Sequence, residues 1–326
     1  MIHRTSPIVV FLATTGVWAQ PYLHAPAVDA YAKHDPAGTT ILPNGRYVRP
    51  EGRHFPLVRF PHGLAMSRDG KRLFVPSDGA GQILTEWQSG APKIVEVRPP
   101  QPPPGRRRGH LNAGGADFSP DGTVLYWSSG DKGTILVYDT VSNQLVAEIS
   151  LNEEVAGKKF EDSYAADLKV SEDGRYLYCA DVTNFRLAVV DTRERRVTGS
   201  TPVGRYPYTL AVTGSRVFVA NIGLFEYSAV PPPDGGNSDP RGLTRPAFGY
   251  PSKEARDGGM FEGRKIPGLG DDNGPQSFSV TGVDVSDPHA PKVISQWKTG
   301  LLIRAPSDNG TTVGGSAPNY VAVSSG

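Results

Sequence analysis

Short apolar segments alternate with polar turns along most of the chain, and their spacing predicts β-strands. From residue 60 onward, apolar stretches of roughly three to six residues are separated by turns rich in Asp, Gly, Ser and Asn. Asp-Gly pairs between apolar runs are typical of tight hairpin turns. The pattern therefore predicts an all-β protein built from antiparallel hairpins.

The strand pattern repeats at a fixed period. Three segments align on Asp-Gly pairs that begin at Asp69, Asp121 and Asp173, so successive copies lie 52 residues apart. In each copy a first strand ends in Ser, the Asp-Gly turn follows, and a second strand such as LFV, LYW or LYC leads to two more. Each repeat therefore predicts a unit of four antiparallel strands.

A fourth copy is interrupted and a fifth is only begun. The fourth starts near Tyr208, and its second half appears only from Ser279, after an insertion over residues 222–277. The fifth copy supplies a first strand at 317–326. The expected units cover about 60–98, 113–151, 164–203 and 206–300.

Small residues crowd the first strand of every unit, as in Gly63, Gly114 to Ala116, Ala166 and Ala211. A radial array of blades explains this, because the innermost strands converge on an axis and leave little room for side chains. We therefore predict an all-β β-propeller of four-stranded antiparallel blades. Four blades and the first strand of a fifth are visible, and we expect them to be part of a seven-bladed ring.

The repeats resemble a known family. The Ser-x-Asp-Gly turns, the strands LFV, LYC and VFVAN, and the endings VYDT and VVDT are similar to the YVTN-repeat, YncE-like β-propellers over residues 60–326. The segments ILPNGRYVRPEGRHFPL, YPSKEARDGG and GRKIPGLGDDNGPQSFSV resemble exported proteins in which such a propeller precedes an alkaline-phosphatase-like phosphoesterase domain. Four units and one first strand make an incomplete ring, and a missing blade would leave strand edges exposed. We therefore expect the chain to be part of a longer protein or to form an unusually open ring.

Composition and charge narrow the function classes. Gly and Pro make up about a fifth of the chain, which disfavours a helical bundle. The 34 basic residues nearly cancel the 33 acidic ones, so no basic field favours nucleic-acid binding. Cys179 is the single cysteine, which excludes an internal disulfide and a cysteine-based metal site.

The amino terminus predicts export. Residues 1–19 combine a short basic start, an apolar stretch and small residues before Gln20, the pattern of a cleaved signal peptide. The apolar run is too short to span a bilayer, and no later segment is long enough. We expect a secreted or periplasmic protein with an extension over 20–58, which contains a possible ring-closing strand, followed by a propeller over 59–326.

Long loops fall on one face of the expected propeller. They cover residues 98–112, 150–164, 222–277 and 301–317, and this elaborated face is the candidate ligand face. We interpret the insertion at 222–277 as a lid over the channel mouth, or alternatively as a solvated decoration or a surface for a partner domain.

Arg106, Arg107 and Arg108 are candidate ligands for an anion, because guanidinium groups hold phosphate or carboxylate through paired hydrogen bonds. The alternative is that they neutralise the acidic loop at 150–164.

Other candidates lie at junctions between loops and inner strands, where they could converge on the channel mouth. They are His62, His110, Asp167, Arg205 and Tyr208.

Weak metal candidates are Asp271, Asp272 and Asn273, which lack the spaced carboxylates of a calcium loop. Turn chemistry alone accounts for them, and we expect no cofactor. Motifs for metalloproteases, nucleophile elbows, phosphate loops and dinucleotides are absent from the sequence.

Three functional hypotheses remain open. The first is an exported non-enzymatic propeller that binds a protein partner or a small anionic ligand on its elaborated face and positions a downstream phosphoesterase domain. The second is a propeller lactonase-type hydrolase acting on a sugar lactone, since the phrase HGLAMSRDGKRLFV is similar in style to that family. The third assigns phosphoesterase activity to the full-length protein.

Overall fold

A computed structural model describes most of the chain, and its contacts divide the chain into two units, Met1–Pro56 and Leu57–Gly326. The described residues are 27, 29–35, 38–49, 51, 55, 57, 60–77, 79–89, 91–100, 114–130, 132–226, 252–261, 264–299, 305–306, 312–313 and 316–324. In the first unit, β1 (Thr40–Ile41) pairs antiparallel with β2 (Tyr47–Val48). Among the described residues, no helix is long and apolar enough to cross a membrane.

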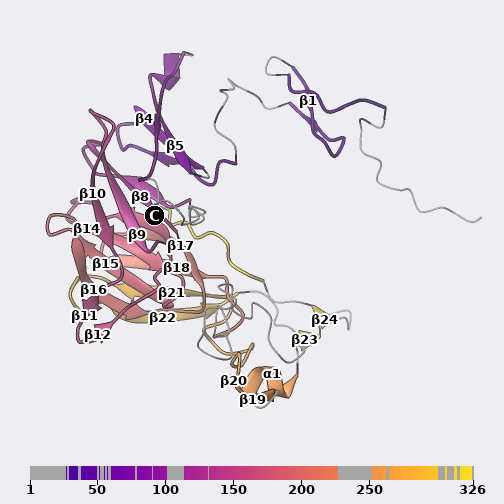
Figure 1. Cartoon of the computed structure of the whole chain (residues 1–326), viewed down its shortest axis with the longest axis vertical. Helices are drawn as coiled ribbons and strands as arrows, with labels where there is room; N and C mark the ends of the chain where they lie inside the picture. Colours follow the sequence, from indigo (N-terminus) through magenta and orange to yellow (C-terminus); the bar gives the residue numbers. More distant parts are fainter. Residues whose placement is uncertain are drawn as a thin grey trace, which may run out of the picture. The chain divides into compact units, whose positions relative to one another are not determined.

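The second unit contains four sheets of four antiparallel strands, as the repeat predicted (Figure 1). Blade one comprises β3 (Ala65–Met66), β4 (Arg72–Ser77), β5 (Ala80–Thr85) and β6 (Lys93–Val97). Blade two comprises β7 (Ala116–Phe118), β8 (Val124–Ser128), β9 (Thr134–Asp139) and β10 (Gln144–Ser150). Blade three comprises β13 (Ala165–Val170), β14 (Tyr176–Asp181), β15 (Arg186–Asp191) and β16 (Arg196–Pro202). Blade four comprises β17 (Pro207–Thr213), β18 (Arg216–Asn221), β21 (Ser279–Asp284) and β22 (Lys292–Lys298).

Segments that the sequence suggested were plain loops contain further elements. The insertion holds α1 (Lys253–Asp257) and the hairpin of β19 (Gly258–Phe261) and β20 (Arg264–Pro267). The loop after blade two holds the hairpin of β11 (Glu154–Val155) and β12 (Lys158–Lys159). The remaining short elements are η1 (Trp87–Ser89), β23 (Ala305–Pro306) and β24 (Thr312–Val313).

The Asp-Gly turns share one hydrogen-bond arrangement. In blade one, Ser67 Oγ donates to Asp69 Oδ1 at 2.6 Å, and the same pair recurs at 2.6 Å in blades two and three. Gly70 has a left-handed φ of 67°, which glycine adopts without strain. The hydroxyl donor and a backbone N–H hold the pKa of Asp69 below its usual value. The Ser-x-Asp-Gly motif therefore fixes the register between the first two strands.

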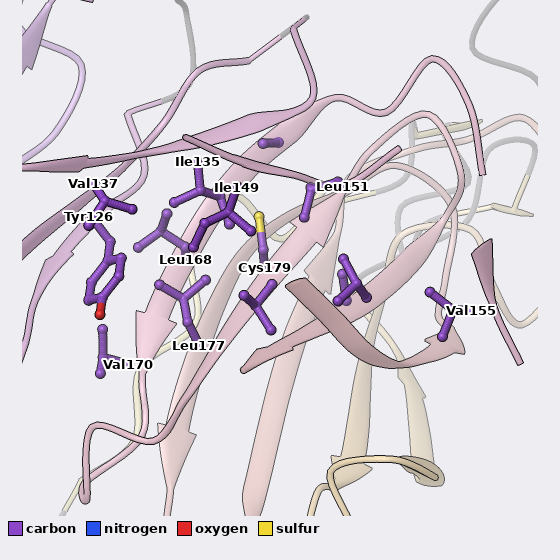
Figure 2. Packing of buried hydrophobic residues seen from close by; sticks show 14 of the residues in the cluster. Tyr126, Ile135, Val137, Ile149, Leu151, Val155, Leu168, Val170, Leu177 and Cys179 are labelled. Carbon is purple, nitrogen blue, oxygen red and sulfur yellow. The ribbon is translucent and has the colours of Figure 1, made fainter. Parts of the chain in front are cut away.

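Alternate residues of the second strands face opposite neighbouring blades. Leu177 and Cys179 pack with residues of blade two, whereas Tyr178 and Ala180 pack with residues of blade four. Figure 2 shows Ile135, Leu168, Leu177 and Cys179 in the core between blades two and three. Burial also raises the pKa of the Cys179 thiol, so this residue is an inert part of the core.

The beginning of the fifth repeat lies beside blade four. The Thr209 hydroxyl of β17 donates to the Asn319 carbonyl at 2.8 Å, and the Thr299 hydroxyl donates to the Ser316 carbonyl at 2.7 Å. The structure assigns no strand to residues 316–324. The Thr209 hydrogen bond places Asn319 next to β17.

Candidate functional site

The first strands of successive blades approach so closely that glycine is required at the contacts. A Cβ on Gly63 would lie 2.5 Å from the Gly114 carbonyl oxygen. A Cβ on Gly115 would lie 2.2 Å from the Ala166 carbonyl oxygen. Both distances are far below contact distance for a carbon atom, so the small residues of these strands are a packing requirement.

A pocket of about 260 Å³ lies where the inner strands of all four blades meet, and we call it the inner-strand pocket. Its lining residues are His62, Gly63, Leu64, Gly114, Gly115, Ala116, Ala166, Asp167, Lys169, Tyr208, Thr209, Leu210, Tyr320 and Val321. The last two belong to the segment that begins the fifth repeat.

The repeat register explains which blades contribute functional side chains. The first strand of each blade ends at or directly before a Ser or Thr, namely Ser67, Ser119, Ser171 and Thr213. The residues five positions before these are His62, Gly114, Ala166 and Tyr208 in blades one to four. Blades one and four therefore place an imidazole and a phenol in the pocket, whereas blades two and three leave space.

Asp167 and Lys169 form the charged part of the pocket. Lys169 Nζ lies 3.2 Å from Asp167 Oδ1. The Lys169 side chain is 37% exposed and the Asp167 side chain is 16% exposed. The same Oδ1 accepts the Leu168 N–H at 2.9 Å, and Oδ2 accepts the Leu210 N–H of blade four at 3.0 Å. The carboxylate is thus fixed by two backbone donors. Lys169 Nζ also donates to the Leu168 carbonyl at 3.1 Å, so one of its three N–H donors remains for a ligand.

A second carboxylate joins blades two and three. Asp117 Oδ2 accepts the Val170 N–H at 2.9 Å, and Oδ1 accepts the Phe118 N–H at 2.9 Å. Burial raises the pKa of Asp117, against the lowering effect of these N–H donors and of Lys169. Asp117 and Asp167 therefore both connect one blade to the inner strand of the next.

Burial also raises the pKa of Tyr208, with Tyr320 as the next cause. The phenol is therefore a neutral hydroxyl that can donate or accept a hydrogen bond at the pocket.

A family model described as a lactonase with a seven-bladed β-propeller matches residues 50–222, more than half of the chain. The chain belongs to this family. The match covers all of blades one to three and the first half of blade four. It therefore contains three complete blades that line the inner-strand pocket.

Two solved structures are similar to the lactonase-family chain at low identity. Hydrazine synthase from Kuenenia stuttgartiensis is 16% identical, with a TM-score of 0.45 over 77% of this chain and 52% of that one. The Cps50 (Swd1) β-propeller domain from Myceliophteria thermophila is 19% identical, with a TM-score of 0.39 over 54% of this chain and 51% of that one. The chain thus spans about half the length of each. No curated protein matches.

The structure brings together three of the predicted site residues of this lactonase-family propeller. His62, Asp167 and Tyr208 line the same pocket, although they come from three different blades. The expected neighbours Arg106, Arg107, Arg108 and His110 lie outside the described residues.

Arg205 lies at the base of the insertion, where the residue is 4% exposed. Nη1 donates to the Leu224 carbonyl at 2.7 Å and to the Asp271 carbonyl at 2.6 Å, and Nη2 pairs with Glu226 Oε1 at 3.0 Å. Nearby, Lys298 Nζ donates to the Gly274 and Ser277 carbonyls at 3.0 and 2.7 Å. Arg205 therefore joins the two ends of the insertion, and Lys298 fixes its carboxyl-terminal end, which is a structural use for the Arg205 donors.

The weak metal candidates Asp271, Asp272 and Asn273 lie in a turn next to the Arg205 contacts. The Asn273 N–H donates to Asp271 Oδ1 at 2.9 Å, and Asp272 is buried. Within the described part of the chain, no group of three His, Cys, Asp or Glu side chains is placed to hold a metal ion.

Sequence reasoning overlooked Lys169 and Tyr320 as pocket residues. Lys169 stands two positions before Ser171, where blades one and four have Ala65 and Ala211 and blade two has Asp117. Charged residues at an inner-strand position where two blades carry Ala were the available signal. Tyr320 carried a weaker signal, since it required aligning the fifth repeat with the fourth.

Proposed function

We propose that the protein is a hydrolase that opens a small sugar lactone in the inner-strand pocket. One observation carries the proposal: the inner-strand pocket gathers an imidazole, an ammonium group and a phenol from His62, Lys169 and Tyr208, which come from three different blades. Membership of the lactonase propeller family supports the same reaction. The pocket is large enough for a single sugar ring.

The chemistry needs a proton acceptor and a group that stabilises negative charge on oxygen. His62 accepts a proton from water as the water oxygen adds to the lactone carbonyl carbon. Lys169 donates to the carbonyl oxygen as negative charge develops there. The bond between the carbonyl carbon and the ring oxygen then breaks, the ring oxygen takes a proton from His62, and a hydroxy acid leaves.

Glucono-δ-lactone hydrolysis, followed by acid release above the spontaneous rate, tests this proposal. We expect His62→Gln to lower kcat by about a hundredfold or more, the range of general-base catalysis. The matched control is His34→Gln, because His34 is an exposed histidine of the first unit. Equal activity of the two variants would remove His62 from the reaction, and no activity of the native chain on any lactone in a panel would refute hydrolysis.

The position of Lys169 predicts a second effect. Lys169→Gln should reduce kcat more than it raises KM, because the ammonium group acts mainly on the charge that develops in the transition state. Lys93→Gln is the matched control, since Lys93 pairs with the exposed Glu86 at the end of blade one. An unchanged kcat in Lys169→Gln would remove Lys169 from the reaction.

A non-enzymatic binding role is the second candidate, and the Asp167 geometry favours it. Both oxygens of this carboxylate accept backbone N–H groups, and one also meets Lys169, so Asp167 is poorly suited to assist His62 as a base partner. In this reading the pocket or the elaborated face binds a ligand or protein partner. An exported YncE-like propeller would then position a downstream phosphoesterase domain. Binding of a sugar acid without lactone turnover would select this role.

A further inference from the structure

A second pocket, of about 220 Å³, lies on blade three among residues that no inner strand contributes. We call it the hairpin pocket, and its main lining residues are Val155, Lys158, Phe160, Arg186, Ser200 and His289. The β11–β12 hairpin supplies one wall, and β16 with the turn before β22 supplies the other. No Asp or Glu is among the described lining residues.

Arg186 is a buried cation with donors to spare. Its side chain is 1% exposed, Nε donates to Asp181 Oδ2 at 2.8 Å, and Nη2 donates to the Leu151 carbonyl at 2.6 Å. Nη1 has only a long contact of 3.5 Å with Ser200 Oγ among the described atoms. Since guanidinium carries five N–H donors, the Nη1 group is the part that can serve a ligand in the pocket.

Asp181 does not compete for that ligand position. Its carboxylate also accepts the Ser163 hydroxyl at 2.8 Å and the Asn184 amide at 3.0 Å. It is fully buried and holds Arg186 in place through the Nε side of the guanidinium. The geometry therefore orients Arg186 while leaving Nη1 available.

Phe160 provides an apolar surface next to two cations. The Arg186 guanidinium carbon lies 3.5 Å from the Phe160 ring centroid, and Lys158 Nζ lies 4.9 Å from it. Lys158 is exposed and has no acidic partner among the described residues, whereas the adjacent Lys159 pairs with Glu161. The Arg186 charge is paired with Asp181, so the positive charge without an acidic partner among the described residues is that of Lys158, beside the apolar side chains of Val155 and Phe160.

We propose that the hairpin pocket binds a small organic carboxylate. The carboxylate would lie between Lys158 Nζ and Arg186 Nη1, where charge-assisted hydrogen bonds form. Its apolar body would rest against Phe160 and Val155. The site is separate from the inner-strand pocket, so it does not depend on the hydrolase proposal.

Calorimetric titration of the full chain with benzoate tests the site, with benzamide as the neutral isostere. We expect benzoate to bind with a dissociation constant of about 1 mM, ordinary for so small a ligand, and benzamide to bind at least tenfold more weakly. Lys158→Gln should weaken benzoate binding about tenfold, because it removes one charge-assisted hydrogen bond. Lys159→Gln makes the same charge change at the next residue and should leave the affinity unchanged.

Several results would overturn the proposal. They are equal benzoate affinity in Lys158→Gln and Lys159→Gln, equal binding of benzamide and benzoate, and no saturable benzoate binding below about 10 mM. A fourth result is loss of binding in Lys169→Gln but not in Lys158→Gln, since this would place benzoate in the inner-strand pocket. Lactone hydrolysis is measured separately, so failure of either site is distinguishable from failure of the other.

Discussion

Replacing Arg205 with Gln separates a structural role from a ligand-binding role for a residue that the sequence suggested as a ligand contact. The change removes two hydrogen bonds to backbone carbonyls and one contact to Glu226, which is 52% exposed. Hydrogen bonds from a charged donor contribute about 1.5–3 kcal/mol each, and a half-exposed ion pair contributes below about 1 kcal/mol. A Gln amide can restore part of one bond, so we expect a loss of about 3 kcal/mol in the free energy of unfolding.

Two measurements test that magnitude. In thermal unfolding, a loss of about 3 kcal/mol corresponds to a decrease in Tm of roughly 6–12 °C for a domain of this size. Limited proteolysis should show faster cleavage between residues 252 and 277, because the ends of the insertion lose their clasp. Arg216→Gln is the matched control: Arg216 is an exposed arginine of the same blade, and its replacement should cost less than about 0.5 kcal/mol.

Unchanged stability with loss of ligand binding would refute the structural role of Arg205. If Arg205→Gln is as stable as Arg216→Gln but loses activity on glucono-δ-lactone or affinity for gluconate, Arg205 acts on the ligand. If stability falls and the remaining folded protein keeps its ligand affinity, the buried guanidinium is structural. The buried position and three internal partners of Arg205 support the second result.

Three further predictions address the turns, the inner strands and the amino terminus. The pKa values of the turn carboxylates Asp69, Asp121 and Asp173 are lowered in the folded state. These carboxylates therefore stabilise the fold above about pH 4, and this stabilisation is lost as pH falls through the lowered pKa values. In acid-unfolding curves, the variant with Asn at all three positions should lose less stability over this range than the native chain. Gly115→Ala should destabilise the protein by about 2 kcal/mol in chemical denaturation and reduce ligand binding, since the new Cβ would meet the backbone of blade three, and a neutral effect would contradict the close approach. If the protein is exported, mass spectrometry of the mature chain should find Gln20 first, and an intact Met1 would contradict this.

The sequence was sufficient to predict the blades because each carries a local signal that does not depend on distant contacts. The Ser and Asp of each turn are two residues apart and satisfy one another, and the following glycine adopts the left-handed φ that the turn requires. Alternating apolar residues in the second strands then specify two buried faces. The turn motif and the alternating pattern each lie within a few neighbouring residues, so both can be recognised in the sequence without knowledge of the fold.

The hairpins within the long loops could not be predicted for the opposite reason. β11 and β12 are two residues each, and β19 and β20 are four, so no hydrophobic period develops over their length. The β11–β12 hairpin is held by contacts distant in sequence, such as Glu153 Oε2, which accepts the Val197 N–H at 3.1 Å. Arg186 likewise looks like an ordinary exposed turn residue in the sequence, and its burial depends on Phe160 and Asp181.

The inner-strand pocket follows from differences between repeats rather than from their similarity. Close approach of the strands requires glycine at Gly63 and Gly115, and a polar side chain is tolerated only where the neighbouring blade leaves space. Asp167 satisfies that condition by bonding to the next inner strand, and Lys169 extends beside it into the pocket. Substitutions in the turns should therefore change stability with little effect on ligand choice. Substitutions at His62, Lys169 or Tyr208 should change ligand choice with little effect on stability, because these side chains are only partly buried and lie outside the cores between blades.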